Sequence, residues 1–346
     1  MAKAPSSAIG IDVGRHSIKA VLLQRRSAGR LALTHFAVRE VPEEANTLEA
    51  LGENLKPLLH DLGATAKAVG IAVSHPDAMV RIIEQNTIPP ELLRDALRIN
   101  GPMLLSQDCR EWVIDCQVIL PSGAASAPKD GEQARYLVGG WPRVHVQKIH
   151  EACGKNKLPS NVLQLPAVAL LNAFEFANAD VFKKEAFVLV DIGHRSSTVI
   201  VGVKGELILV RGLDYGGAHF VEHLILQGAA SFEEAVAMME QEEVLTVENA
   251  RLSLNELVRS ISSSIGFFEA QREETIPRIF VSGGLSRLPA LRSILVEELN
   301  LPCETWDPFA DCELGIPRAR VASLTAQLPL LGVAFGVAAE IVKGGA

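Results

Sequence analysis

The chain has 346 residues, 48% of them hydrophobic and 21% charged, and its formal net charge is −8. This composition excludes a disordered chain, indicates about two globular domains, and argues against a nucleic-acid-binding surface. The five cysteines are odd in number and form no CxxC pair, which is typical of reduced thiols in a cytosol and predicts no zinc site.

Targeting and membrane-spanning segments are not expected. Asp12 and Arg15 interrupt the apolar run near the N-terminus, which therefore lacks the apolar core of a signal peptide. The longest apolar stretch, residues 328–342, contains Glu340 and is shorter than the roughly 20 residues that cross a bilayer. We expect a soluble protein that reaches a membrane only through a partner.

The first predicted element is a β-hairpin over residues 8–24, AIGIDVGRHSIKAVLLQ. Two β-branched apolar runs flank a polar turn that contains Asp12 and Gly14. A helical leucine face over residues 48–62 then predicts a helix that ends at Gly63, and AVGIAVSH (68–75) predicts a buried strand.

Residues 81–158 differ in pattern and predict a small inserted α+β module. A helix is expected after Pro89 and Pro90, and strands are expected over residues 110–120 and 134–141. The segment between these strands, PSGAASAPKDGEQ (121–133), predicts an exposed low-complexity loop.

A second hairpin is predicted over residues 186–203, AFVLVDIGHRSSTVIVGV, after an apolar helix over 165–177. Its DIGHRS (Asp191–Ser196) nearly repeats DVGRHS (Asp12–Ser17). One such sequence indicates only a hairpin with an ordinary Asp-Gly turn. Two copies, each between two apolar β-branched runs, favour an internal duplication with a ligand between the copies. The glycine permits close backbone approach or positive φ, and the turn N–H groups can face an anion. The aspartate can hold the water ligands of a Mg²⁺ ion that bridges phosphates.

The remainder is predicted to be largely helical over residues 216–272, with Ser231 and Glu234 as a capping box. IFVSGGLSRLPALRSILVEELN (279–300) then predicts a strand, a Gly283-Gly284 turn and a helix. This turn has two interpretations. It either lets a base or ribose lie against the backbone of the glycines, or it is only a tight turn between strand and helix. His219 and His223 have metal-ligand spacing but no third ligand, which favours a partly buried helix face.

Taken in this order, the segments resemble the actin-like superfamily and, within it, the PilM family of type IV pilus assembly and its FtsA relatives. The narrower resemblance rests on IGIDVGRHSIKAV, RGLDYGGAHF, SFEEA, SISSSIGFFEAQREETIPRIFVSGGLSRLPALRSIL, LNLPCETWDPF and LGVAFGVAAE. It implies an α/β, duplicated two-domain fold with a small inserted α+β module in the first domain. The implied first domain is 1–80 with 159–182 and 320–346, the module is 81–158, the second domain core is 183–215 with 276–319, and a helical subdomain is 216–275.

The resemblance also implies a function. Proteins of this family bind ATP with Mg²⁺ in the interdomain cleft and hold the short cytoplasmic N-terminal segment of the inner-membrane protein PilN, alongside other pilus assembly proteins. They are cytoplasmic, peripheral to the inner membrane through that partner, and do not bind nucleic acid or insert into the membrane. The implied nucleotide-binding residues are Asp12, Gly14, Arg15, Lys19, Asp191, Gly193, Ser196, Ser197, Gly216, Gly217, Ser282, Gly283 and Gly284, with Asp12 and Asp191 holding Mg²⁺ through water.

Several positions depart from the family pattern. Arg15 and His194 replace small residues of the two hairpin turns, and Ala218 replaces an asparagine or aspartate. Val236 and Met239 replace a glutamate and a lysine that contact the ribose and base. These changes predict weak binding on the adenosine side.

Catalysis is expected to be slight, because Pro166 aligns with a water-orienting glutamine and no catalytic residue is identified. The cations Arg15, His16, His194 and Arg195 either compensate phosphate charge or point to solvent.

Two alternatives remain open at this stage. An FtsA-like cell-division filament protein would end in a basic amphipathic membrane helix, whereas this sequence ends in EIVKGGA. A small-molecule (sugar) kinase would need a base aspartate beside the substrate pocket of the first domain.

Overall fold

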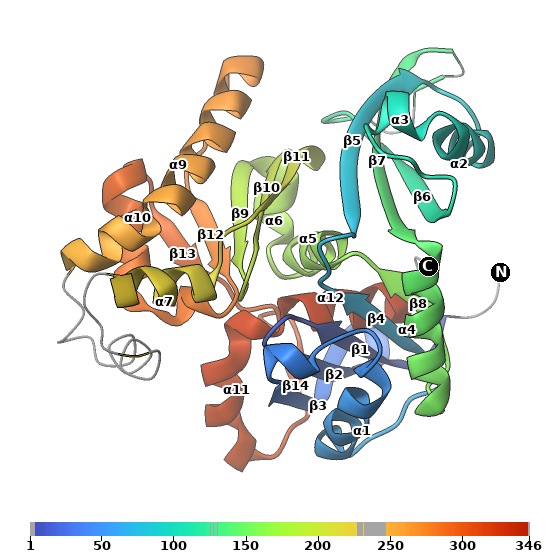
Figure 1. The fold of residues 1–346 in the computed structure, drawn as a ribbon, viewed down its shortest axis with the longest axis vertical. Coiled ribbons are helices and arrows are strands. Elements are labelled where there is room, and N and C mark those ends of the chain that lie inside the picture. The colour runs from blue at the N-terminus through green and yellow to red at the C-terminus, as the bar shows by residue number, and fades with distance from the viewer. Residues whose placement is uncertain are drawn as a thin grey trace. The chain divides into compact units, whose positions relative to one another are not determined.

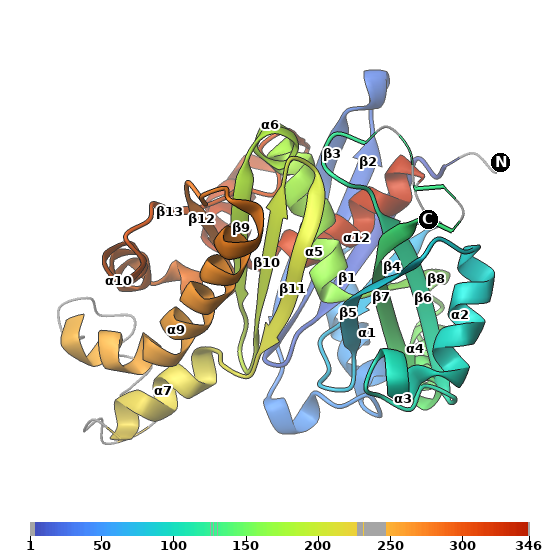
Figure 2. The same ribbon diagram turned by 90° about the horizontal axis from the view of Figure 1, so that it is seen from above.

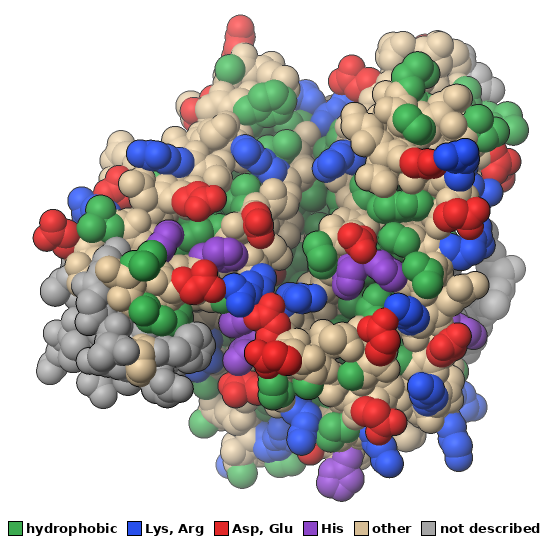
Figure 3. Space-filling view, in the orientation of Figure 1, with side chains coloured by type: hydrophobic (Ala, Val, Ile, Leu, Met, Phe, Trp, Pro, Cys, Tyr) green, Lys and Arg blue, Asp and Glu red, His purple; other side chains and the backbone are tan. Residues whose placement is uncertain are grey.

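The computed structural model describes residues 4–124, 126, 128–129, 131–226, 231 and 247–344 (Figures 1 and 2). The chain forms two compact units. The first comprises Met1–Ala179 and Pro308–Ala346, and the second is the continuous segment Asp180–Asp307. On the face shown in Figure 3, acidic and basic side chains are interspersed rather than separated by sign.

The first unit contains a six-stranded sheet in the order β14-β3-β2-β1-β4-β8. Strands β1 and β2 form an antiparallel hairpin, and β4 pairs with β1 in parallel. The strands are β1 (Ser7–Val13), β2 (Ser17–Arg25), β3 (Leu31–Glu40), β4 (Val69–Val73), β8 (Ser160–Gln164) and β14 (Glu313–Leu314).

Helices cover both faces of this sheet. On one face, α1 (Leu51–Leu62) and α4 (Arg143–Lys155) pack against alternate residues of β1 and β2, and α1 ends at Gly63 in the left-handed conformation, as the sequence predicts. On the other face lie α5 (Pro166–Ala177) and α12 (Gly332–Lys343). Short elements complete the unit: η1 (Ser27–Gly29), η2 (Glu43–Ala45), η4 (Arg318–Arg320), α11 (Val321–Gln327) and η5 (Leu328–Leu330).

Helix α12 approaches its neighbours so closely that two contacts require glycine. A Cβ atom on Gly10 of β1 would lie 2.0 Å from the Ala334 carbonyl oxygen, and one on Gly336 would lie 1.7 Å from the Ala169 carbonyl oxygen. Real Cβ atoms do not approach backbone oxygens this closely, so backbone packs directly against backbone here. Among the described residues, no single helix is long and apolar enough to cross a membrane. One pair bent by 93°, Arg318–Leu330 with Gly332–Lys343, meets those requirements together.

A three-stranded sheet, in the order β5-β7-β6, forms the inserted module within the first unit. It consists of β5 (Met79–Asn86), β6 (Trp112–Ile119) and β7 (Gln133–Pro142), with α2 (Pro90–Ile99) and α3 (Gly101–Leu104) on one side (Figure 1). The expected loop over 121–133 lies partly outside the described residues.

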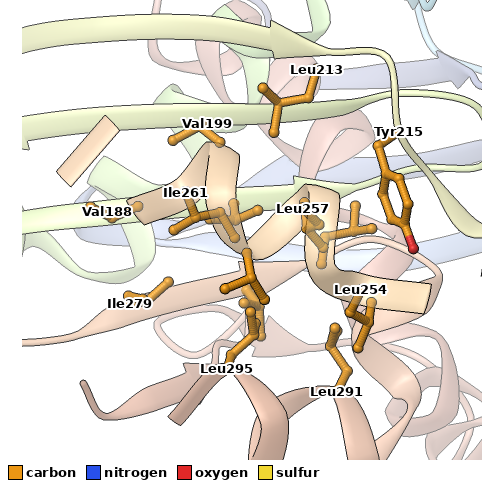
Figure 4. Packing of buried hydrophobic residues seen from close by; sticks show 14 of the residues in the cluster. Val188, Val199, Leu213, Tyr215, Leu254, Leu257, Ile261, Ile279, Leu291 and Leu295 are labelled. Carbon is orange, nitrogen blue, oxygen red and sulfur yellow. The ribbon is translucent and has the colours of Figure 1, made fainter. Parts of the chain in front are cut away.

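The second unit contains a five-stranded sheet in the order β11-β10-β9-β12-β13. Leu257 and Ile261 of α9 lie among side chains of the sheet and of α10 in its core (Figure 4). The elements are α6 (Ala179–Lys184), β9 (Ala186–Ile192), β10 (Ser197–Val203), β11 (Glu206–Leu213), α7 (Gly217–Leu226), α9 (Val247–Arg272), β12 (Ile279–Ser282), η3 (Leu285–Arg287), α10 (Pro289–Leu299) and β13 (Cys303–Thr305).

The two large sheets share one topology. In each sheet, the two strands of the hairpin pair antiparallel, β1 with β2 and β9 with β10. The first strand of the hairpin also pairs in parallel with a later strand, β1 with β4 and β9 with β12. The five-strand order of the second sheet matches β3-β2-β1-β4-β8 of the first. The near-repeat in the sequence therefore reflects a duplicated α/β arrangement.

Candidate nucleotide-binding site

The two hairpins have the same turn geometry. In the first, Val13 pairs with Ile18, and in the second, Ile192 pairs with Ser197, so four residues form each turn. The Gly14 N–H donates to the Ser17 carbonyl oxygen at 3.1 Å, and the Gly193 N–H donates to the Ser196 carbonyl oxygen at 3.1 Å. The duplication thus extends to the hydrogen bond that closes the turn.

Space rather than backbone conformation favours glycine in both turns. A Cβ on Gly193 would lie 2.7 Å from the Ser196 carbonyl oxygen, and one on Gly14 would lie 2.8 Å from Lys19 Nζ and 3.0 Å from the Ser17 carbonyl oxygen. Neither glycine has a positive φ, so the conformational reason that the sequence suggested does not apply. At Gly193 the close contact is with backbone, whereas at Gly14 it is first with the end of the Lys19 side chain.

The two aspartates have different partners. Asp12 lies opposite Lys19 on the neighbouring strand, and Lys19 Nζ lies 3.1 Å from Asp12 Oδ2. Both residues are buried, at 5% and 8% exposure. Asp191 lies opposite Thr198, and its Oδ1 accepts a hydrogen bond of 2.8 Å from the Ser282 hydroxyl. The first carboxylate is therefore paired with a cation, whereas a hydroxyl group contacts the second.

Asn46 supports the first turn, although the sequence analysis did not identify it. Its buried amide donates to the carbonyl oxygens of Gly14 at 2.5 Å and Arg15 at 3.1 Å. These bonds fix the positions of two carbonyl groups of the turn. Asn46 lies 32 residues from Gly14 in a loop before α1, where no local pattern marks it.

The arginines of the two turns contact carboxylates of their own units. Arg15 Nη2 lies 3.4 Å from Glu43 Oε1, and Arg195 Nη1 lies 2.7 Å from Glu222 Oε1. All four side chains are partly exposed, so each pair contributes little to stability, about 0–1 kcal/mol. Each arginine therefore has a carboxylate contact within its own unit, and compensation of phosphate charge by these residues stays a prediction.

In the second unit, the Gly216-Gly217 turn lies against the hairpin turn. The Gly217 N–H donates to the Gly193 carbonyl oxygen at 2.9 Å, and the Ala218 N–H donates to that of His194 at 2.8 Å. A Cβ on Gly216 would lie 2.5 Å from the His194 carbonyl oxygen.

The two serines at the second hairpin turn differ in exposure. Buried Ser197 donates its hydroxyl to the Tyr215 carbonyl oxygen at 2.6 Å, whereas Ser196 is exposed. Of the two hydroxyl donors expected from the sequence, Ser196 is the accessible one.

The Ser282–Gly284 turn completes this group at the carboxyl end of β9. Gly283 has φ +87°, and a Cβ there would lie 2.3 Å from the Ile192 carbonyl oxygen, so glycine is needed on both grounds. Gly284 is exposed and precedes the short helix η3 rather than the longer helix that the sequence predicted directly after it. The structure therefore brings together the predicted residues of the second unit.

The remaining sequence predictions have mixed outcomes. His219 Nδ1 accepts the Gly216 N–H at 3.2 Å and His223 Nδ1 lies 3.3 Å from the Ser253 carbonyl oxygen, which agrees with a structural role for this pair. Pro166 is the first residue of α5. Val236, Met239 and the capping-box residue Glu234 lie outside the described residues.

A cavity of about 280 Å³ lies beside the first hairpin, entirely within the first unit. Sequence reasoning did not anticipate it, because four separate segments form its wall. It is lined by Val13, Gly14, Arg15, Glu43, Asn46, Thr47, Leu48, Glu49, Leu51, Val73, Ser74, His75, His145 and Lys148.

Comparisons with known proteins agree with this architecture. The family model described as type IV pilus assembly protein PilM matches residues 10–341. A solved structure described as the PilM-PilN type IV pilus biogenesis complex has a TM-score of 0.84 at 23% identity, covering 97% of this chain and 98% of that chain. The ethanolamine utilization protein EutJ from Carboxydothermus hydrogenoformans has a TM-score of 0.54 at 14% identity, covering 98% and 90%. The predicted actin-like, duplicated fold is confirmed.

Proposed function

Because this chain belongs to the PilM family of type IV pilus assembly proteins, we propose that it is the actin-like scaffold of a type IV pilus or related secretion machine. In this role it binds ATP with Mg²⁺ and a short cytoplasmic segment of a PilN-like inner-membrane protein. That partner would hold it, as a cytoplasmic protein, at the inner membrane. The observation that best supports nucleotide binding is the repeated hairpin. Both copies have the same turn, the same hydrogen bond closing the turn, and an aspartate at the same position.

The side chains of the two hairpins suit a magnesium–phosphate group. Asp191 and Asp12 supply carboxylates for the water ligands of Mg²⁺, which would bridge the phosphate oxygens of ATP. Lys19 supplies a cation for phosphate, and the turns around Gly14 and Gly193 supply N–H groups. Lys19 contacts Asp12 and the Ser282 hydroxyl contacts Asp191, and we expect both carboxylates to contribute to the attraction for Mg²⁺.

Binding is expected to be weak on the adenosine side, and hydrolysis slow. Loss of two hydrogen bonds to charged groups, at Val236 and Met239, would weaken binding by roughly two to four decades, at about 1.5–3 kcal/mol each. Met239 would recover part of this by packing on the base. Pro166 offers no side-chain group to orient a water, so phosphate release should stay below about one per second, in contrast to typical enzymes.

Calorimetric titration with ATP and Mg²⁺ tests the nucleotide site. We expect Asp191→Ala and Asp12→Ala each to reduce the affinity, and Asp180→Ala, which changes an exposed aspartate on α6, to leave it unchanged. The double variant Val236→Glu, Met239→Lys should tighten binding. Equal affinity in wild type and Asp191→Ala, or fast phosphate release, would contradict the proposal.

For the partner segment, the inserted module offers an apolar sheet face. Side chains alternate along its strands, so Val80 and Ile82 of β5 and Leu137 of β7 lie on the face opposite the module core. All three are half-buried. Gly139 of β7 approaches Leu165 of the first domain so closely that a Cβ would lie 2.2 Å from Leu165 Cδ1. An extended apolar peptide suits a surface where a sheet face meets a second wall.

Fluorescence polarisation with labelled N-terminal peptides of PilN-like proteins tests this surface. We expect Ile82→Glu and Leu137→Glu to weaken binding by at least about tenfold, because a charge would replace an apolar contact. Ile99→Glu is the matched control, since Ile99 lies on α2 and is 74% exposed. Failure with every candidate peptide, together with robust phosphorylation of a sugar, would overturn the scaffold proposal in favour of a kinase.

A further inference from the structure

Two chain segments connect the inserted module to the first domain. Residues 74–78 lead from β4 into β5, and β7 leads directly into α4 at Pro142 and Arg143. His75 and Asp77 lie on the first connection, and His145 lies in the first turn of α4, just after the second. Side chains that ligate metal ions are thus present on both connections.

The three side chains are close enough to share one ion. His75 Nδ1 lies 3.6 Å and His145 Nδ1 lies 3.7 Å from Asp77 Oδ2, and one ligand atom from each residue lies within 4.8 Å of the other two. A tetrahedral ion with bonds of about 2.0–2.2 Å separates its ligands by about 3.3–3.6 Å. Small side-chain rotations would therefore close the group around an ion.

Both imidazoles are suited to metal binding. The side chains of His75 and His145 are 21% and 15% exposed, and histidine is the commonest metal ligand among protein side chains. His145 Nδ1 is buried and has no hydrogen-bond partner among the described residues. His75 Nδ1 accepts the Asp77 N–H at 3.2 Å, a long hydrogen bond that an ion at this nitrogen would replace.

The surrounding charges leave the attraction of Asp77 for a cation largely intact. The cations that line the adjacent cavity are paired, Arg15 with Glu43 and Lys148 with Glu49. Within the described ranges, the ion-pair contacts of Asp77 are both with histidines. Two imidazoles and a carboxylate are a ligand set that Zn²⁺ and similar ions favour.

We propose that His75, Asp77 and His145 bind one divalent transition-metal ion, such as Zn²⁺, which cross-links the two connections between the inserted module and the first domain. Three protein ligands leave one tetrahedral position. Both histidines line the cavity beside the first hairpin, so a water or an anionic oxygen in that cavity completes the coordination. The ion would stabilise the folded chain because it binds the assembled connections and not the unfolded ones.

The test uses the full chain without a histidine tag, treated with a chelator and titrated with Zn²⁺ against a chromophoric competitor. We expect one ion per chain and a rise in melting temperature. Titration with Co²⁺ should give the intense visible absorption of a tetrahedral site. His145→Ala and Asp77→Asn should each weaken Zn²⁺ binding by at least about tenfold, since even residues that only support metal ligands change affinity by 10–100-fold.

His150→Ala is the matched control, because His150 is an exposed histidine on the same helix, and it should bind Zn²⁺ as wild type does. Asp77→Asn preserves shape at a side chain that is 54% exposed, so its metal-free melting temperature should match that of wild type. No Zn²⁺ binding by wild type, or equal binding by wild type and His145→Ala, would overturn the proposal. The assay contains neither nucleotide nor a pilus partner, so its outcome is independent of the proposed function.

Discussion

Lys19 and Asp12 form an ion pair across β1 and β2, with Nζ 3.1 Å from Oδ2 and side-chain exposures of 11% and 7%. This pair places a cation and a carboxylate directly beside the first turn. Because burial separates both groups from water, each depends on the other for compensation of its charge.

Removal of the cation alone should therefore be strongly destabilising. We expect Lys19→Met to lower the free energy of unfolding by about 3–5 kcal/mol, because it leaves a buried carboxylate unpaired. The double change Asp12→Ala, Lys19→Met should recover much of the loss. Urea denaturation measures both, with Lys148→Met as the control, since its partner Glu49 is exposed and the loss of that solvated pair should change stability little. Equal effects of the two lysine changes would show that burial of the Asp12–Lys19 pair is unimportant.

Asn46 should be important for the shape of the first turn. Asn46→Ala removes the donors to the carbonyl oxygens of Gly14 and Arg15, and we expect it to cost about 1–3 kcal/mol in denaturant unfolding. Asn54→Ala removes a single exposed bond to the Ala45 carbonyl oxygen and should cost less. If the two variants lose the same stability, the buried location of Asn46 does not matter.

The contact between α12 and α5 should not tolerate a methyl group. We expect Gly336→Ala to destabilise the first unit by about 3 kcal/mol or more, because the new Cβ would collide with the Ala169 backbone. Gly154→Ala, in α4 of the same unit, meets no atom within 4 Å and should be neutral or slightly stabilising. The melting temperatures of the two variants, measured by thermal unfolding, test this prediction. A stable Gly336→Ala protein would imply that the helices separate easily.

Cys303 should react slowly with thiol reagents below strongly alkaline pH. Burial raises the pKa of Cys303 from 9.0 to about 11, so at pH 8 it carries about 100-fold less reactive thiolate than an ordinary cysteine. Its labelling rate should rise about tenfold per pH unit and level off only near pH 11. Mass spectrometry of iodoacetamide-treated protein, with urea-unfolded chain as the reference, measures this rate. A plateau near pH 9 in the folded protein would contradict the effect of burial.

Local patterns were sufficient for much of the fold. Alternating β-branched runs predicted both hairpins, and the leucine spacing before Gly63 predicted α1 and its end, because these signals depend on neighbours within a few residues. The near-repeat of Asp-x-Gly predicted the duplication. Two strands of the inserted sheet, β6 and β7, were also predicted from their turn-bounded apolar runs, whereas β5 was not.

The candidate sites were less predictable, because they depend on contacts between distant residues. Asn46 is 32 residues from Gly14 in the sequence, so their hydrogen bond depends on tertiary structure. His75 and His145 meet because two separate connections cross the same boundary. The carboxylate partners of Arg15 and Arg195 likewise come from other segments of the chain, where no local pattern marks them.

The position of α12 has a consequence for protein synthesis. Between Val13 at the end of β1 and Gly332 at the start of α12, the ribosome must add more than 300 residues, which takes about 15–60 s at about 5–20 residues per second. Throughout that time, Gly10 lacks the helix that covers its side of the sheet. The second unit is a single continuous segment, so it can complete its core on the ribosome before the first unit, although the first unit begins at the N-terminus. Early chaperone binding should therefore concentrate on the uncovered face of β1, and release should follow the emergence of α12.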